Sequence, residues 1–404
     1  MYPDLSYFFH DLLGTATDNW TSIFKMFGFM LVMALISCGF LLKSELKRLE
    51  NAGLIQPQTK TIQYSERTGW NDIFLNIFFT VFLVSKLLVI IKDVAAFSAD
   101  PAGLLFSGQG NWTIGIIAGL IVGIYYFMSN QKKPAGIKEQ QITFMPSDKT
   151  NDIIMLAGLS GVFGSKMFSI LENLEGFFAD PLGSIFSGSG LNVYGGLIVA
   201  FFFVYRYVQS IGIKPIYMMD IGGMGILLGY AVGRMGCQLS GDGDWGIVAA
   251  AQPEWWFLPD WLWSYHYPNN VNNEGILLQG CDPEIYQKAL AERMPAEQRC
   301  MEACGMRYCH QLSPGVYPTP VYETVISLLG LAGLWAIRIK NLIPGTIFFI
   351  YMIFNGAERF WIETIRVNDR YEYFGLNWSQ AQYLSVLFII LGTAGLAYLY
   401  RKKS

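Results

Sequence analysis

Ionisable side chains stand at the ends of long apolar segments of this sequence, where charge is costly. Arg234 ends one such segment, and Arg359 and Glu363 lie four residues apart near the end of another, with Arg366 three residues later. An arginine at the centre of a membrane span costs at least about 2.5–3.5 kcal/mol, so such residues usually mark a functional site. Two arginines in one site are typical of the recognition of an anion such as a phosphate.

These charged residues also have structural explanations that the sequence leaves open. Arg359 and Glu363 are one helical turn apart, so they could simply pair with each other. Arg234 could extend toward the membrane surface. However, the glycines around Arg234 leave room for a ligand headgroup and expose backbone N–H donors.

Four other polar residues near these segments have equally open interpretations. Asp242 and Asp244 stand in a Gly-Asp-Gly-Asp stretch that could form only a turn. Tyr322 and Glu323 begin another apolar segment and could form a hydrogen-bonded pair between helices. Each of these residues could therefore belong to a site or to its scaffold.

The composition identifies the class of protein that must position these residues. Of the 404 residues, 52% are hydrophobic and only 15% are charged, whereas about a quarter are charged in a soluble protein. We therefore predict an all-α integral membrane protein that is embedded through several helical spans. The net charge of −3 argues against nucleic-acid binding.

The hydrophobic pattern predicts about nine membrane-spanning helices, at residues 21–42, 70–91, 111–129, 151–171, 191–208, 216–239, 318–337, 344–362 and 379–400. The segments that follow odd-numbered spans contain 16 lysines and arginines, and those on the other side contain 7, of which four lie in one long loop. Positive charge marks the inner side of a membrane. The N-terminus is therefore expected outside and the C-terminus inside.

The long outer loop, residues 240–317, contains four of the six cysteines: Cys281, Cys300, Cys304 and Cys309. Disulfides persist outside the cell membrane, and four cysteines allow three pairings. A zinc site that includes His310 is the alternative. The four tryptophans of residues 252–265 suit either the membrane interface or the core of a small cap.

An internal repeat with an offset of 80 residues covers spans two to five. The pair Ser85-Lys86 returns as Ser165-Lys166, and each copy consists of two spans with a short outer loop. The copies differ at the start of the second span, where Tyr194-Gly195-Gly196-Leu197 replaces Ile114-Gly115-Ile116-Ile117. We interpret the first copy as structural and the second as functional, and the polar segments 43–69 and 130–150 as inner linkers.

The expected topology places the polar motifs on the outer side of the membrane, where they predict one site. The corresponding domains are 1–69, the first span and a linker; 70–130, the degenerate repeat; 150–239, the catalytic half; 240–317, an extracytoplasmic cap; and 318–404, the last three spans.

Four motifs resemble those of the prolipoprotein diacylglyceryl transferases of bacterial inner membranes. The family signature Gly-Arg-x-Gly-Asn-Phe-x-Asn-Gly-Glu is similar to residues 233–242, and the family's His-Gly-Gly-Leu is similar to residues 194–197. Residues 318–323 and 356–366 resemble two further family motifs. The resemblance covers the first span and residues from about 150 to the C-terminus.

The resemblance implies transfer of the diacylglyceryl group of phosphatidylglycerol to the lipobox cysteine thiol of preprolipoproteins, with release of glycerol phosphate and no cofactor. Arg234 and Arg359 would bind the phosphate, and Glu363 would orient Arg359. Tyr194 stands at the family's histidine and is a poor general base at neutral pH, so Asp242 could take the thiol proton. The implied substrate-binding residues are Lys166, Gly195, Gly196, Gly236, Cys237, Gly246, Tyr322, Glu323 and Arg366.

The departures from the family pattern keep other functions open. Cys237 replaces the signature asparagine and could itself be a nucleophile, and Asp242 replaces the signature glutamate. One extra residue precedes Trp245-Gly246. An anion or lipid transporter and a catalytically inactive, lipid-binding relative are the alternatives.

Overall fold

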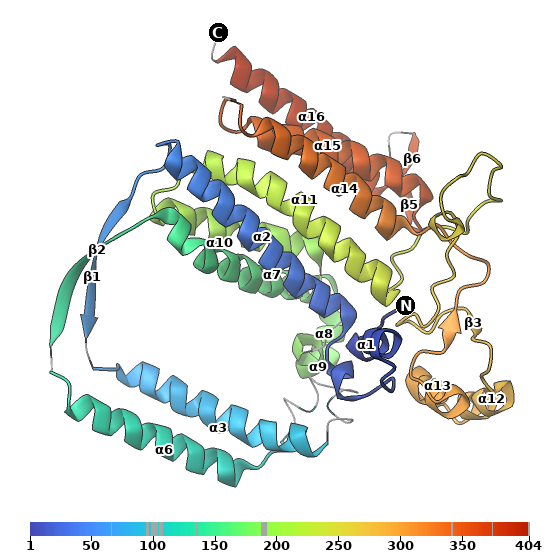
Figure 1. Cartoon of the computed structure of the whole chain (residues 1–404), viewed down its shortest axis with the longest axis horizontal. Coiled ribbons are helices and arrows are strands. Elements are labelled where there is room, and N and C mark those ends of the chain that lie inside the picture. Colours follow the sequence, from blue (N-terminus) through green and yellow to red (C-terminus); the bar gives the residue numbers. More distant parts are fainter. Residues whose placement is uncertain are drawn as a thin grey trace. The chain divides into compact units, whose positions relative to one another are not determined.

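The computed structural model describes residues 1–65, 67–93, 97, 104, 108–134, 136–186, 192–340, 342–373 and 375–402. The long helices are α2 (Met26–Asn51), α3 (Trp70–Lys92), α6 (Trp112–Gln131), α7 (Thr150–Glu172), α10 (Val193–Ser210), α11 (Pro215–Ser240), α14 (Thr319–Ile337), α15 (Thr346–Ile362) and α16 (Gln380–Arg401) (Figure 1). Within the described ranges, seven helices are long and apolar enough to cross a membrane. The remaining two, α10 and α15, are 18 and 17 residues long. The predicted helical membrane protein is confirmed.

The shorter elements are α1 (Leu5–Leu13), η1 (Trp20–Ile23), β1 (Gln58–Ser65), β2 (Ile137–Phe144), η2 (Pro146–Lys149), α8 (Leu174–Ala179), α9 (Pro181–Phe186), η3 (Asp260–Leu262), β3 (Ile276–Leu277), α12 (Pro283–Ala291), α13 (Ala296–Cys304), β4 (His310–Gln311), η4 (Glu363–Ile365), β5 (Arg370–Tyr373) and β6 (Leu376–Ser379). The chain forms two compact units, which are described separately. One unit contains Met1–Leu49 and Ile213–Ser404, and the other contains Glu50–Gly212.

In the first unit, α11 packs against α14 and α15, and α15 packs along α16. In Figure 1, α14, α15 and α16 form the orange and red group of helices. A Cβ atom at Gly392 of α16 would lie 2.9 Å from the carbonyl oxygen of Phe349. Helix α2 also contacts α11: the Cys38 thiol of α2 donates a hydrogen bond to the carbonyl oxygen of Gly225 in α11 at 3.2 Å. Small residues thus let these helices approach closely in an environment where apolar burial gives little driving force.

The first 25 residues differ from the sequence-based prediction. Helix α2 begins at Met26 rather than at residue 21, and the short helices α1 and η1 precede it. The backbone N–H of Met26 donates to the carbonyl oxygen of Pro3 at 3.0 Å, and Asp4 caps α1. Residues 20–23 therefore form the separate short helix η1 before the span, which hydrophobicity alone does not reveal.

In the second unit, the two copies of the repeat form the helix pairs α3–α6 and α7–α10. The segments that we interpreted as inner linkers contain strands that the sequence did not predict, because residues 58–65 and 137–144 form an antiparallel two-stranded sheet. The hydroxyl groups of Thr59 and Thr143 lie 3.0 Å apart across this sheet. Both strands are largely polar, so their composition favoured a loop.

Both copies fix the start of their second helix in the same way. The N–H of Asn111 donates to the carbonyl oxygen of Ser85 at 3.0 Å, and the N–H of Asn192 donates to that of Ser165 at 3.1 Å. Each asparagine side chain then caps its helix. The offset between the two copies is therefore 80 residues in the first helix of each pair and 81 residues in the second helix of each pair. The segment that connects the two helices is one residue longer in the second copy.

This register corrects the alignment of the glycines. Gly196 corresponds to Gly115, not to Ile116 as the constant offset implied. A Cβ atom would lie 2.6 Å from the carbonyl oxygen of Val81 at Gly115, and 2.9 Å from that of Gly161 at Gly196. Close packing between the two helices of each pair requires a glycine here in both copies.

The loop of residues 240–317 contains two disulfides, Cys281–Cys304 and Cys300–Cys309. The structure therefore confirms the prediction of disulfides over the zinc alternative. The aromatic segment is largely exposed, with Trp255 at 69% and Phe257 at 87% of their full accessibility. This exposure favours a membrane interface over a buried cap core for residues 252–265.

We predict that Gly392→Ala destabilises the protein by about 1–3 kcal/mol, because the added methyl group overlaps the backbone of α15. Gly225→Ala on α11 is the matched control, since a Cβ atom there meets nothing within 4 Å. Thermal unfolding in detergent measures both. Equal melting temperatures for the two variants would show that the α15–α16 contact is not tight.

Candidate functional site

The carboxylate of Glu323, in the first turns of α14, lies between three arginines. Its oxygens are 2.8 Å from Arg234 Nε, 3.1 Å from Arg359 Nη1 and 3.3 Å from Arg366 Nη1. The Glu323 side chain has no exposed surface. A buried carboxylate is costly unless it is paired and hydrogen-bonded, and these three contacts supply the partners that Glu323 needs.

Two further carboxylates complete the cluster of Arg234, Arg359, Arg366, Asp244, Glu323 and Glu363, which we call the arginine cluster. Asp244 bridges two of the guanidinium groups, because it contacts Arg234 and lies 2.6 Å from Arg366 Nη2. Glu363 Oε2 lies 3.0 Å from Arg359 Nη2. Three guanidinium groups thus face three carboxylates. Asp244 is the most accessible of these carboxylates, with 36% of its side chain exposed.

The turn after α11 brings Asp244 back over Arg234. Gly241 ends the helix at φ +64°, and Gly243 follows at φ +97°. Both values favour glycine, which has no Cβ atom to clash with the backbone. The hydroxyl group of Thr319 donates to the carbonyl oxygen of Asp244 at 3.0 Å, which ties this turn to the start of α14.

The next residues run between the start of α14 and the end of η4. The N–H of Gly246 donates to the carbonyl oxygen of Tyr317, and the N–H of Ile247 donates to that of Ile365, both at 2.9 Å. A Cβ atom at Gly246 would lie 2.6 Å from the Ile365 carbonyl oxygen. Gly246 therefore lets three backbone segments meet beside the arginine cluster.

The two aspartates of the turn differ in their electrostatics. Burial alone would raise the pKa of Asp244, but the guanidinium groups of Arg234 and Arg366 outweigh burial and hold this pKa below its ordinary value. Burial raises the pKa of Asp242, and the charge of Asp244 adds to this rise. Asp244 therefore stays ionised at neutral pH, whereas Asp242 is the one better suited to exchange a proton. The Cys237 thiol lies between them, 3.5 Å from Asp244 Oδ2.

The structure brings together five of the predicted site residues in the arginine cluster: Arg234, Glu323, Arg359, Glu363 and Arg366. Three others have local contacts instead. The hydroxyl group of Tyr322 donates to the carbonyl oxygen of Leu262, so it anchors the loop of residues 240–317. A Cβ atom at Gly236 would lie 3.0 Å from Met30 Cβ, and Gly246 packs against backbone as described above.

Four predicted residues belong to the second unit: Lys166, Tyr194, Gly195 and Gly196. Tyr194 is 49% exposed at the first turn of α10. A Cβ atom at Gly195 would overlap the Phe168 side chain of α7. Helix packing therefore accounts for both glycines, and the role of these four residues in the site stays a prediction.

Sequence reasoning missed two carboxylates. Asp244 was left open between a turn residue and a site residue and was not among the predicted site residues, although the two arginines beside it need counter-charge. Glu358 was not identified as a candidate site residue, although it precedes Arg359 in the sequence. A carboxyl group within an apolar helix itself indicates a functional site. Glu358 is 7% exposed, and its Oε1 atom has no hydrogen-bond partner among the residues that the structure describes.

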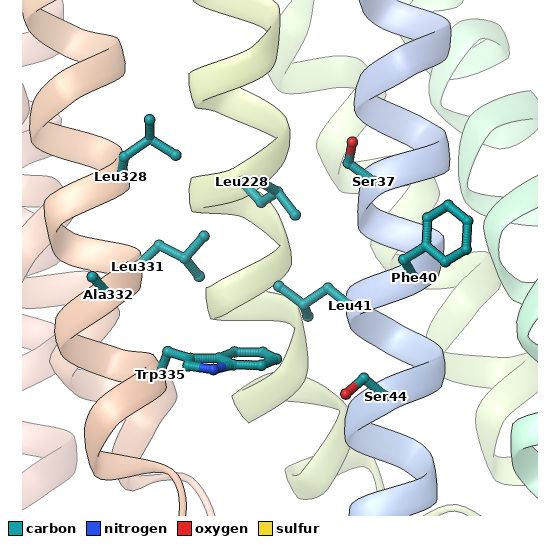
Figure 2. Close-up of a pocket in the computed structure, with 9 residues that line it drawn as sticks. All are labelled: Ser37, Phe40, Leu41, Ser44, Leu228, Leu328, Leu331, Ala332 and Trp335. Atoms are coloured by element: carbon teal, nitrogen blue, oxygen red, sulfur yellow. The ribbon is translucent and has the colours of Figure 1, made fainter.

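A groove of about 560 Å³ lies in the first unit, and none of the arginine-cluster residues lines it. Figure 2 shows α2 and α14 on its two sides with α11 between them; the lining residues are Ser37, Phe40, Leu41, Ser44, Leu228, Leu328, Leu331, Ala332 and Trp335. None of these side chains is ionisable. The groove therefore suits hydrocarbon rather than a charged headgroup.

Long apolar helices that end in a buried cluster of arginines define a multi-pass membrane protein with a site suited to a phosphate-bearing ligand. The family of prolipoprotein diacylglyceryl transferases matches residues 110–398, and the chain belongs to this family.

Similar proteins carry the name phosphatidylglycerol–prolipoprotein diacylglyceryl transferase. One from Lysinibacillus sphaericus is 25% identical over 256 residues, which are 63% of this chain and 78% of that protein. One from Dehalococcoides mccartyi is 27% identical over 264 residues, 64% of this chain and 81% of that protein. One from Halalkalibacterium halodurans is 24% identical over 295 residues, 72% of this chain and 84% of that protein.

We predict that Glu323→Gln destabilises the protein by about 3–5 kcal/mol, because three largely buried arginines then face only two carboxylates. Thermal unfolding in detergent, followed by circular dichroism, measures the effect. Glu254→Gln, in the exposed part of the loop, is the control that should unfold like the unsubstituted protein. A Glu323→Gln variant with unchanged stability would contradict the central role of this carboxylate.

Proposed function

We propose that this protein transfers the diacylglyceryl group of phosphatidylglycerol to the lipobox cysteine of preprolipoproteins and releases glycerol phosphate, in the inner membrane of a bacterium. The observation that carries the proposal is the convergence of Arg234, Arg359 and Arg366 on one buried carboxylate in a member of this transferase family. A transporter or an inactive relative is not favoured, because the similar proteins carry the name of one enzyme.

The arginine cluster provides what the phosphate of phosphatidylglycerol requires. Bidentate guanidinium groups bind phosphate and stabilise the charge that develops on the leaving glycerol phosphate. The two buried carboxylates, Glu323 and Glu363, hold the arginines in fixed orientations before substrate binds. Asp244 is accessible and bridges Arg234 and Arg366. The phosphate would therefore replace Asp244 as the partner of these two arginines.

The reaction itself exchanges one bond for another. The sulfur of the lipobox cysteine attacks the glyceryl carbon that bears the phosphate oxygen; the C–S bond forms as the C–O bond breaks. The electron pair leaves on the phosphate oxygen of glycerol phosphate. The thiol proton must be accepted by a base, because only the thiolate is a good nucleophile.

The proposed topology has nine spans, with the N-terminus and the loop of residues 240–317 outside. The excess of basic residues after odd-numbered spans and the two disulfides of this loop support that orientation. The arginine cluster then lies in the outer half of the membrane, on the side where preprolipoproteins emerge. The exposed Trp255 and Phe257 fit the outer membrane interface.

We predict that Arg234→Ala and Arg359→Ala each lower diacylglyceryl transfer by about 100- to 1,000-fold, as expected for the loss of a group that stabilises developing charge. Purified protein is incubated with phosphatidylglycerol and a lipobox peptide, and both diacylglyceryl peptide and glycerol phosphate are measured. Arg401→Ala, at the exposed end of α16, is the control and should leave transfer unchanged. Full turnover in either cluster variant would exclude the phosphate-binding role.

We further predict that Asp244→Asn lowers the KM for phosphatidylglycerol several-fold, because the asparagine no longer competes as an anion for Arg234 and Arg366. The same assay at varied lipid concentration in mixed micelles measures KM. Asp260→Asn, an aspartate elsewhere in the loop, serves as the control. An increased KM in the Asp244 variant would show that this carboxylate positions the arginines for the lipid instead of occupying its place.

A further inference from the structure

A second cavity in the first unit lies between α14 and α15 and has a volume of about 360 Å³. Its lining is apolar except for one carboxyl group, that of Glu358, beside Ile326, Phe354, Trp361 and Ile362. Trp361 is 72% exposed, so the cavity opens toward the lipid-facing side of the helices. A substrate that is embedded in the bilayer can reach this opening without crossing the loop of residues 240–317.

The cavity and the arginine cluster occupy adjacent faces of one helix end. Glu358, Trp361, Ile362 and Ile365 follow the spacing i, i+3, i+4 and i+7, which places them on one face. Arg359 follows Glu358 in α15 and Glu363 follows Ile362, so these two residues of the cluster lie on the next face around. On α14, Ile326 of the cavity stands one turn from Glu323 of the cluster. A group in the cavity is therefore a direct neighbour of a phosphate at the cluster.

The Glu358 carboxyl group is buried without the partners that the other carboxylates of this region have. Glu323, Glu363 and Asp244 each contact at least one guanidinium group. Glu358 Oε1 has no hydrogen-bond partner in the described part of the chain, and the side chain is 93% buried, being 7% exposed. A buried polar atom without a partner is unfavourable, so this carboxyl oxygen is available to a proton donor that enters the cavity.

We propose that Glu358 is the general base of the reaction and that the lipobox cysteine thiol enters the cavity between α14 and α15; this inference rests on the proposed function. The Glu358 carboxylate takes the thiol proton as the sulfur attacks the glyceryl carbon and the C–O bond breaks. The resulting carboxylic acid then passes this proton to the phosphate oxygen of glycerol phosphate at the arginine cluster. The base is thereby regenerated, and no other reactant is required.

Two other residues of this chain are weaker candidates for the base. Tyr194 replaces the family's histidine, and a neutral phenol hydroxyl group is a poorer proton acceptor than a carboxylate. Asp242 already accepts a hydrogen bond from the N–H of Asp244 at 3.4 Å and lies against the chain's own thiol, that of Cys237. Glu358 combines a free carboxyl oxygen with space for an incoming sulfur.

The test is the pH–rate profile of Glu358→Gln in the transfer assay. At pH 7 we expect a loss of at least about 100-fold, the lower range for general-base catalysis. The rate of this variant should rise about tenfold per pH unit toward the pKa of a free thiol, about 8.5, as thiolate forms without a base. A peptide with selenocysteine in place of cysteine, whose selenol ionises without help at neutral pH, should restore transfer by the variant.

The profile must be compared with that of the unsubstituted protein, because other titratable and charged groups surround Glu358. These are Tyr230 and Arg234 of α11, Glu323 of α14, Tyr351 and Arg359 of α15, and Arg366. All of them are present in both proteins, so the difference between the two profiles reports Glu358 alone. The KM for phosphatidylglycerol should stay within about twofold, since the arginines are unchanged.

Several results would overturn the inference. A Glu358→Gln variant with the unsubstituted rate at pH 7 removes the need for this base, and a variant that is inactive at every pH and with selenocysteine shows a structural role. If the glutamine variant does not fold, Glu358→Asp and Glu358→Asn repeat the comparison with a shorter side chain, and equal rates overturn the role. Absence of transfer by the unsubstituted protein overturns the proposed function and this inference with it.

Discussion

The first unit depends on the charge balance around Glu323. A carboxylate with no exposed surface must be paired, and it is paired with three arginines that come from α11, α15 and the segment after η4. Removing one partner from such a group typically costs several kcal/mol, because the remaining charges stay buried. The ends of these three elements are therefore held together by electrostatics at the place where apolar burial contributes least.

This requirement explains much of the local backbone. The chain turns sharply at Gly241 and Gly243 so that Asp244 can supply counter-charge to Arg234 and Arg366. It then runs beside Tyr317 and Ile365 through Gly246, where a side chain would overlap the backbone. Gly241, Gly243 and Gly246 thus allow the backbone turns that bring the charged side chains of the ion pairs together. Their first role is to shape the polypeptide, and any contact with a lipid headgroup depends on that shape.

Much of this arrangement could be predicted from the sequence, because charge within apolar helices is rare and has few explanations. Arg234, Arg359, Glu363 and Arg366 were identified on that basis, and the helices fall in the expected ranges. Glu323 was predicted as a substrate-binding residue or as one member of a hydrogen-bonded pair, and its place at the centre of the arginines was not predicted, since periodicity does not reveal which helices meet. The strands β1 and β2 were missed because a polar, alternating segment favours a linker until its partner, about 80 residues away, is known.

The balance of three guanidinium groups and three carboxylates also constrains how an anion can bind. A cluster with no net formal charge does not attract a phosphate through long-range electrostatics. Binding must instead be an exchange, in which the ligand replaces one carboxylate of the cluster. The carboxylate that leaves is the one whose transfer to water costs the least free energy. Glu323 and Glu363 are almost completely buried, whereas Asp244 is 36% exposed, so Asp244 is the carboxylate that can leave. The buried pair then keeps the arginines in place during the exchange, which makes the cluster selective for a ligand with the shape and hydrogen-bonding pattern of a phosphate.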